Sequence, residues 1–273
     1  MADLDGVRGT ARAYRVLVGS RLRSQLSYRT SFTLDFAGSF VVGVVEFFEI
    51  YVIFHNIPRL GGLDLTGALL VFGLANLGFA LGDLVAGHID EVPNLIRLGT
   101  LDVLLLRPLP VLAQLMTNDI QLRRFGRASL GVVVLAVGLS RADVDWTPAR
   151  VALFAVTPIA AAVLFAALFV TAGAVQFWLV DGGEFTHAFT YGTSYAASFS
   201  PAVLPLPLRA FFSFVVPASF TAYLPTLAIL GQPGPALLPA WLGWCVPAVA
   251  IVAWLVALGL WRLGMRHYSG AGG

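Results

Sequence analysis

Long apolar stretches separated by short polar ones run through the 273 residues of the chain. About 20 apolar residues suffice for a helix to cross a hydrocarbon core about 30 Å thick, at a rise of about 1.5 Å per residue. The pattern therefore predicts an all-α, polytopic membrane protein with six transmembrane helices. We expect these spans near residues 31–54, 65–89, 128–140, 148–180, 206–224 and 240–260.

The longest polar interruption covers residues 91–127 and predicts short helices that lie on a membrane surface. Pro93 fits a first helical turn, where no backbone N–H is needed, and Gly99 fits a left-handed residue that ends the helix. A second helix is expected to begin at Thr100, whose hydroxyl can cap it, with Asp102 favourably placed in its first turn.

This second helix is expected to end at Arg107 and Pro108, and a third is expected to start near Pro110. The third helix has a polar and an apolar face, which suits a helix lying on a surface. Its predicted polar face holds Gln114, Thr117, Asn118, Gln121 and Arg124, and its apolar face holds Leu112, Leu115, Met116 and Ile120.

The remaining polar segments are assigned to the membrane surfaces. Residues 1–30 carry six arginines and no signal-peptide core, so we expect a retained interfacial helix, with a basic disordered tail as the alternative. Residues 181–205 are rich in hydroxyl and aromatic side chains and are predicted to be interfacial, on the cytoplasmic side. Residues 225–239 contain four prolines, which suits a re-entrant segment, and 261–273 form a short basic tail.

The distribution of arginine fixes the predicted orientation. Six spans with the N-terminus inside place 14 arginines in the cytoplasm and only Arg59, Arg141 and Arg150 outside. Both termini are then cytoplasmic. The whole chain is predicted to form one transmembrane domain, with the cytoplasmic segment at 90–127 between spans 31–89 and 128–180 and the last two spans within 206–260.

Composition excludes several function classes. The chain is 58% hydrophobic and 12% charged, with a mean hydropathy of +0.83, which is far from the composition of a soluble domain. All 17 basic residues are arginine. Without lysine the chain cannot hold a P-loop or form a Schiff base. The net charge of +2 comes from loops and does not indicate nucleic-acid binding.

No enzyme motif is visible. The single cysteine, Cys245, cannot form an internal disulfide, and the four histidines are scattered without metal-ligand spacing. No serine lies in a G-x-S-x-G elbow. A polytopic membrane enzyme is therefore disfavoured, and we expect this chain to bind no metal or cofactor.

Four motifs resemble the permease subunits of type 2 ABC transporters, the exporter class, and most closely a six-span branch. They are RLGTLDVLLLRPLPVLAQLM at 97–116, the FTHAFTYG segment at 185–192, VVPASFTAYLPTLAILG at 215–231 and the terminal RHYSGAGG. The most specific is G-x-L-D-x-x-L-x-R-P, which maps to Gly99, Leu101, Asp102, Leu105 (or Leu104), Arg107 and Pro108.

The resemblance implies a coupling segment between spans two and three, re-entrant helices before the last span, and a bacterial inner-membrane location. It also implies an ABC ATPase dimer on separate chains, which would hold the ATP and magnesium, and a second permease copy or a related permease. The residues expected to couple to that ATPase are Glu91, Thr100, Asp102, Arg107 and Pro108. Alternatively, Asp102 and Arg107 only cap and pair within a surface helix.

Polar residues at bilayer depth are the other functional candidates, because charge there is costly unless paired or wetted. Glu46 and Glu49 share a helix face and could line a pathway for a cationic or amphipathic substrate. Asn76 and Asp83 lie in the second span, and Asp83 could instead pair with an arginine. Gly78 and Gly82 are spaced for close helix packing or, more boldly, for a dimer contact. A non-transporting membrane scaffold remains the main alternative to an exporter subunit.

Overall fold

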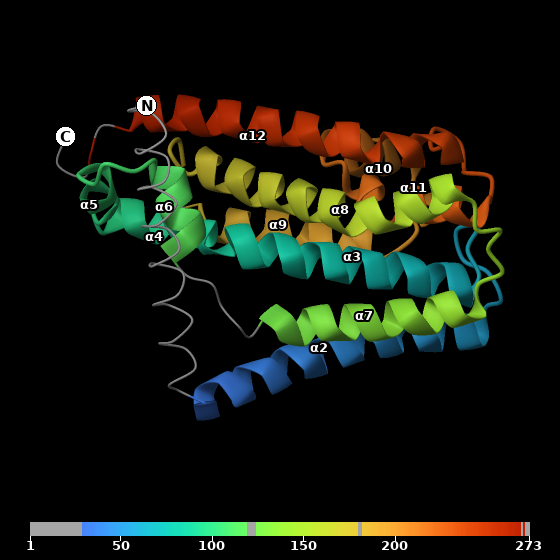
Figure 1. The fold of residues 1–273 in the computed structure, drawn as a ribbon. Coiled ribbons are helices and arrows are strands. Elements are labelled where there is room, and N and C mark those ends of the chain that lie inside the picture. Colours follow the sequence, from blue (N-terminus) through green and yellow to red (C-terminus); the bar gives the residue numbers. More distant parts are fainter. Residues whose placement is uncertain (1–28, 119–123, 180–181, 269, 271–273) are drawn as a thin grey trace, which may run out of the picture.

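The computed structural model of the chain describes residues 29–118, 124–179, 182–268 and 270 (Figure 1). The expected interfacial helix over residues 1–30 falls almost entirely outside this part. All regular elements in the described residues are helical, as predicted, and no strand occurs among them.

Six longer helices run along the bundle and shorter helices lie at its two ends (Figure 1). The longer ones are α2 Arg29–Asn56, α3 Leu65–Ala86, α7 Arg124–Arg141, α8 Pro148–Val175, α9 Gly183–Ala197 and α12 Val246–His267. At one end lie η1 Gly87–Glu91, α4 Val92–Arg97, α5 Leu101–Leu105 and α6 Val111–Asn118. At the other end lie η2 Pro201–Val203, α10 Leu206–Ala210, η3 Phe211–Val215, η4 Ala218–Phe220, α11 Tyr223–Leu230 and η5 Ala240–Cys245.

We call the two ends of the bundle the coupling end and the far end. The coupling end holds α4, α5, α6 and the C-terminal end of α12, and the far end holds α10, α11 and the loop at 57–64 (Figure 1). The two regions are therefore separated by the full length of the long helices.

Helix α3 forms the centre of the bundle, because small residues on it let its neighbours approach closely. A Cβ atom at Gly73 would lie 2.8 Å from the Cβ of Leu135 on α7. One at Gly78 would lie 2.5 Å from Ala161 on α8, and one at Gly82 would lie 2.7 Å from Phe165. The paired glycines thus pack against α8 of the same chain, and this contact occupies the face that could have served a dimer.

Four helices are long and apolar enough to cross a membrane, which confirms a multi-pass membrane protein. They cover Phe36–Asn56, Leu65–Arg97, Pro148–Val175 and Ala240–His267. A fifth candidate, Leu206–Val215 with Ala218–Leu230, is bent by 68° at its centre. By this criterion the described residues contain four or five spans, fewer than the six that the sequence predicts.

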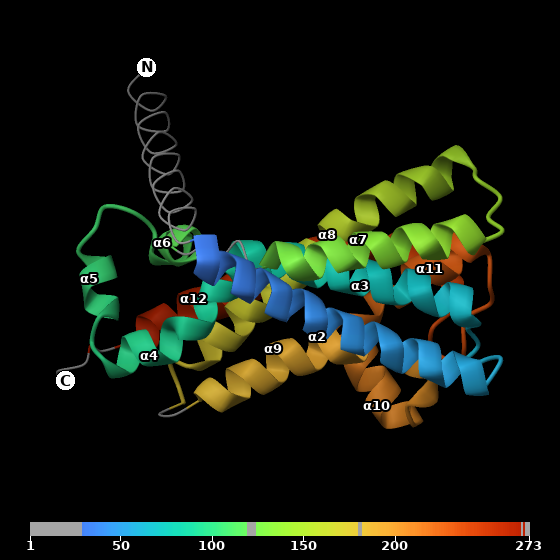
Figure 2. The same ribbon diagram turned by 90° about the horizontal axis from the view of Figure 1, so that it is seen from below.

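Helix α9 corrects the assignment of residues 181–205 to one membrane surface. Near its start, Thr186 accepts a hydrogen bond of 2.6 Å from Gln176 at the end of α8. Beyond its other end, the Ser200 hydroxyl donates to the Gly61 carbonyl at the far end, 2.8 Å away. The segment therefore runs along α3 between the two ends of the bundle (Figures 1 and 2).

The hydroxyl-rich composition of α9 does not prevent its burial, because two of its threonine hydroxyl groups bond to carbonyls of the same helix. Thr190 donates to the Thr186 carbonyl at 2.8 Å and Thr193 to the Phe189 carbonyl at 2.6 Å, each four residues back. These side chains then expose few unsatisfied polar groups to the neighbouring helices. Composition alone, which does not include such bonds, suggested a surface segment.

The predicted span at 206–224 is not one continuous helix, although the bent pair of helices that contains it can still be a broken span. Pro217 lacks a backbone N–H, and the helix breaks there between η3 and η4. Arg209 donates to the carbonyls of Pro201, Ala202 and Leu204, which lie at the far end. Arg209 therefore lies at the far end, away from the arginines of the coupling end. Part of the expected re-entrant segment 225–239 is the helix α11, which ends at the left-handed Gly231.

Candidate functional site

The coupling end contains the short helices that the sequence predicts. Pro93 lies in the first turn of α4, and Gly99 adopts the left-handed conformation at φ +67° between α4 and α5. Asp102 lies in the first turn of α5. The capping role expected of Thr100 is wrong, because its hydroxyl donates to the Leu95 carbonyl at 3.4 Å and does not accept from α5.

Helix α5 is fixed to its surroundings by two side chains from outside it. The Gln114 amide donates to the carbonyls of Leu104 and Leu109, at 2.9 and 2.8 Å. Gln114 is buried, which corrects its predicted place on a polar outer face. The Tyr268 hydroxyl, beyond the end of α12, donates to Asp102 Oδ1 at 3.0 Å. Neither tie was predicted from the sequence.

An exposed apolar surface surrounds α5, although this segment projects beyond the long helices (Figure 1). Leu106 is 86% exposed and Leu98 is 69% exposed, and Val103 and Leu105 are also exposed. We call these four residues the α5 apolar surface. Exposed apolar side chains that lie together in this way form a candidate surface for contact with lipid or with another protein.

The other predicted coupling residues lie around this surface. Glu91 accepts a hydrogen bond of 2.9 Å from Asn94, which in turn accepts one of 3.1 Å from Arg97. Arg107 is exposed beside Pro108, and within the described residues its side chain makes no ion pair or hydrogen bond. Arg107 therefore makes no contact that would hold α5 in place, whereas Asp102 accepts the Tyr268 hydrogen bond.

Two arginines of α7 neutralise the carboxylates predicted at bilayer depth. Arg124 Nε lies 2.9 Å from Asp83 Oδ2, and both side chains are nearly buried. One turn further along α7, Arg127 Nη2 lies 3.1 Å from Glu46 on α2. Arg127 Nε also donates to the Asn76 amide oxygen at 2.7 Å. Three of the four predicted pathway residues are thus bound by arginines inside the bundle.

A polar cavity of about 280 Å³ lies beside these ion pairs. Arg127 contributes to it while its guanidinium lies over the Phe79 ring, 4.6 Å from the ring centroid. Positive and negative side chains both line the cavity, so it carries no strong excess of either charge. Its lining comes from α2, α3, α7 and α9, namely Ser39, Val42, Phe79, Ala80, Asp83, Arg124, Arg127 and Tyr191.

Glu49 and Glu46 both lie on α2, but their surroundings differ. Glu49 is exposed and accepts a hydrogen bond of 3.1 Å from the Tyr195 hydroxyl on α9. This contact crosses an open groove of about 540 Å³ between α2 and α9, which lie on the same face of the bundle (Figure 2). The groove is lined by Val45, Phe48, Glu49, Val52, Ile53, Tyr195 and Phe199.

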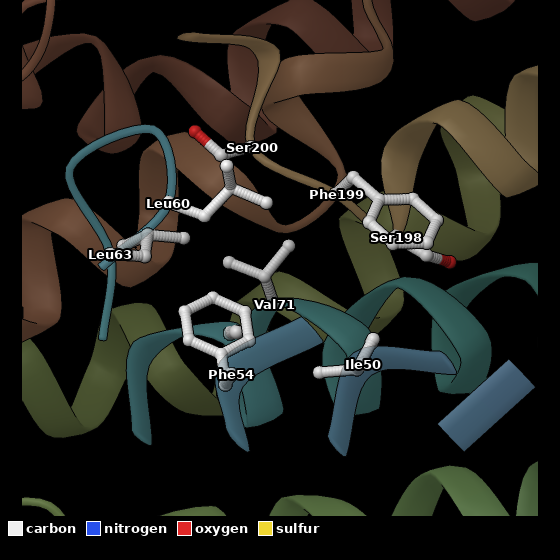
Figure 3. A pocket seen from close by; sticks show the side chains of 9 residues that line it. Ile50, Phe54, Leu60, Leu63, Val71, Ser198, Phe199 and Ser200 are labelled. Carbon is white, nitrogen blue, oxygen red and sulfur yellow. The ribbon is translucent and has the colours of Figure 1, made fainter. Parts of the chain in front are cut away.

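Apolar side chains close the space between α2 and α9 at the far end (Figure 3). Ile50 and Phe54 of α2 approach Leu60 and Leu63 of the following loop. The remaining cavity has about 10 Å³, which is room for about one water molecule. The groove is therefore wide in its middle and closed toward the loop at 57–64.

Sequence reasoning missed the arginine and tyrosine partners for different reasons. Arg124 was placed on the polar face of a surface helix, but it lies in α7 and its side chain is 7% exposed. Glu46 and Arg127 are 81 residues apart, so no local spacing connects them. An arginine near the start of an apolar helix was the only available signal.

One of three comparisons with known proteins found a match. Among the described residues, no group of three or more His, Cys, Asp or Glu side chains could hold a metal ion. A search of curated proteins and a search of solved structures each found no match. The family model described as "ABC-2 family transporter protein" matches residues 40–272. The chain belongs to this family of membrane permeases of ABC transporters.

Proposed function

We propose that the chain is one of two permease subunits of an ATP-driven exporter in a bacterial inner membrane. The second subunit is a copy of this chain or a related permease, and a separate pair of ATPase chains holds ATP and magnesium. The permease role follows from the family. The direction of transport, the partners and the location are the parts proposed here.

The α5 apolar surface is the observation that carries this proposal. Four large aliphatic side chains are exposed on and beside a short helix that lies beyond the ends of the long helices. An apolar groove on a partner protein would remove this surface from water, at roughly 25 cal/mol per Å². An ATPase that closes on ATP can then displace α5 relative to the bundle.

The proposed topology keeps six crossings but changes one of them. We assign the crossings to α2, α3, α7, α8, α9 and α12, with α10 and α11 as a bent insertion at the non-cytoplasmic surface. Helices α7 and α9 are less apolar than the others, and internal ion pairs and hydroxyl-to-carbonyl hydrogen bonds support their burial. The coupling end is assigned to the cytoplasm because of its arginines.

The proposed pathway follows the groove between α2 and α9. Its walls are apolar apart from Glu49 and Tyr195, which suits an amphipathic substrate more than a strongly cationic one. Glu46 offers no free negative charge because Arg127 neutralises it. The second permease would cover the open side of the groove.

The experiment is purification of the complex with Leu106→Asp or with Leu237→Asp as its matched control. Both leucines are exposed, but Leu237 lies at the far end. We expect the wild type and Leu237→Asp to retain an ABC ATPase, identified by mass spectrometry, and its ATP hydrolysis. We expect Leu106→Asp to lose both. A wild-type chain that is purified in lipid without any ATPase would support the scaffold alternative instead.

A cysteine-labelling experiment tests the revised topology. In a Cys245→Ser background, a cysteine at Ala202 should react with a membrane-impermeant maleimide added outside intact cells. The assignment of 181–205 to the cytoplasm requires that this cysteine be protected. A cysteine at Val103 should be protected in both topologies and serves as the control.

A further inference from the structure

The C-terminal end of α12 contacts α5 through a single pair of side chains. The Tyr268 hydroxyl donates to Asp102 Oδ1 at 3.0 Å across a separation of 166 residues. Both side chains are only partly buried. Burial, followed by the hydrogen bond to Asp102, raises the pKa of Tyr268, so the phenol remains a protonated donor at neutral pH. A hydrogen bond from a neutral donor to a carboxylate is stronger than one between two neutral groups.

Tyr268 is itself held firmly on the ends of α8 and α12. Its ring meets the Phe177 ring edge to face at 5.9 Å, and Phe177 meets Trp261 of α12 in the same way at 5.3 Å. Gly264 leaves the space that Phe177 fills, because a Cβ atom at Gly264 would collide with that ring. The ends of two long helices therefore fix the position of the phenol.

The other side-chain ties near α5 stay within the coupling segment. Thr100 donates to the Leu95 carbonyl, and Gln114 donates to the Leu104 and Leu109 carbonyls. Among the described residues, the hydrogen bond between Tyr268 and Asp102 is the only side-chain hydrogen bond that links α5 to the end of a long helix. The ties from Thr100 and Gln114 hold the shape of the coupling segment, and Tyr268 sets its position relative to the bundle.

We propose that Tyr268 is a positioning residue that joins α5 to the ends of α8 and α12, so that these three elements move as one body. This role rests on the proposed function, since it matters only where a partner displaces α5. A displacement of α5 would then pass directly to α12, the last crossing, which packs along α8. Without the Tyr268 hydroxyl, α5 would move alone.

The first test uses the chain alone in lipid nanodiscs and needs no ATPase. Tyr268→Phe keeps the ring on Phe177 and removes only the donor. We expect the backbone amides of residues 98–106 to exchange with deuterium about three- to tenfold faster, as for the loss of one hydrogen bond. Tyr195→Phe removes a comparable bond to Glu49 and should leave these amides unchanged. Unchanged exchange in Tyr268→Phe would overturn the proposal.

The second test uses the complex with its ATPase. Spin labels replace the exposed Arg107, directly after α5 and outside the α5 apolar surface, and the exposed Leu263 on α12, in a Cys245→Ser background. With Tyr268 present, we expect the distance between the labels to stay the same when ATP is added, and with Tyr268→Phe we expect it to change. A distance that changes equally in both proteins would also overturn the role of Tyr268.

The two tests can reject the proposed function and the role of Tyr268 independently of each other. Absence of a bound ATPase would reject the proposed function, and the exchange experiment would still decide whether Tyr268 holds α5. An ATPase that binds and drives equal label movements with and without the phenol would reject the positioning role while leaving the proposed function intact.

Discussion

Helices α3 and α2 have nearly equal hydropathy but opposite surroundings. The mean hydropathy of the most apolar part is 1.9 in α3 and 1.8 in α2. Yet 78% of that part is buried in α3, against 11% in α2. Hydropathy identifies a crossing helix, but it does not say whether protein or another environment surrounds the helix.

The carboxylates on α3 and α2 differ in burial in the same way. Asp83 of α3 and Arg124 form a nearly buried pair, whereas Glu46 of α2 and Arg127 are each about one-fifth exposed. Glu49 of α2 is exposed and contacts only the Tyr195 hydroxyl among the described residues. The interior of this chain is therefore built on α3, while α2 presents a face with a charged residue that lipid would not tolerate.

Removal of Arg124, the arginine that pairs with Asp83 of α3, should have the largest effect on stability. Arg124→Ala leaves the Asp83 carboxylate in a buried site without its cation, which typically costs about 3 to 5 kcal/mol of unfolding free energy. The measurement is unfolding in mixed micelles, followed by tryptophan fluorescence. Arg262→Ala is the control, because Arg262 is exposed at the end of α12.

A second substitution distinguishes the effect of a buried carboxylate that has lost its arginine from the effect of lost side-chain packing. Asp83→Asn in the Arg124→Ala background removes the carboxylate that has lost its arginine and should recover most of the lost stability. If the double variant is as unstable as Arg124→Ala, the guanidinium acts through packing and the ion pair is unimportant.

Glycine substitutions should give an intermediate effect that differs between the two helices. A Cβ at Gly82 of α3 would lie 2.7 Å from Phe165 and 2.8 Å from the Ala162 carbonyl oxygen, so α8 must shift. We expect Gly82→Ala to destabilise the protein by about 1 to 3 kcal/mol, as for other overpacked cores. The same unfolding experiment measures it.

Gly38 of α2 provides the matched control, because a Cβ atom added there would meet no other atom within 4 Å. Gly38→Ala should be neutral or slightly stabilising, since alanine favours helix by up to about 1 kcal/mol. Equal destabilisation by both substitutions would mean that α2 is packed as tightly as α3.

The sequence predicts four of the long apolar helices and the short helices within residues 91–118, because apolar length and turn residues act locally. The left-handed Gly99 and the first-turn Asp102 are confirmed. Residue pairs such as Tyr268 with Asp102 depend on how distant helices pack, and no periodicity within one helix encodes that. Thr100 shows the same limit, since its hydroxyl donates to a carbonyl of the preceding helix.

The two errors at 181–224 have a common physical cause. Composition reflects only the free energy of moving side chains out of water. In α9, however, the buried Thr190 and Thr193 hydroxyl groups donate to carbonyls of the same helix. The next segment is apolar enough to cross, yet Pro217 breaks its hydrogen bonding. Intrahelical hydrogen bonds and backbone breaks, which hydropathy ignores, therefore decide which of the two segments runs along the bundle.

The smallest expected effect is that of Glu49→Gln on α2. The carboxylate accepts one exposed hydrogen bond of 3.1 Å, and exposed polar contacts contribute about 0 to 1 kcal/mol. If water or a second permease covers this face, the neutral amide should change the unfolding free energy in nanodiscs by less than about 1 kcal/mol. A face exposed to lipid gives a different result, because burying a charge at bilayer depth costs about 2.5 to 3.5 kcal/mol. Stabilisation of that size by Glu49→Gln would show that α2 faces lipid and would remove the groove between α2 and α9 from the proposed pathway.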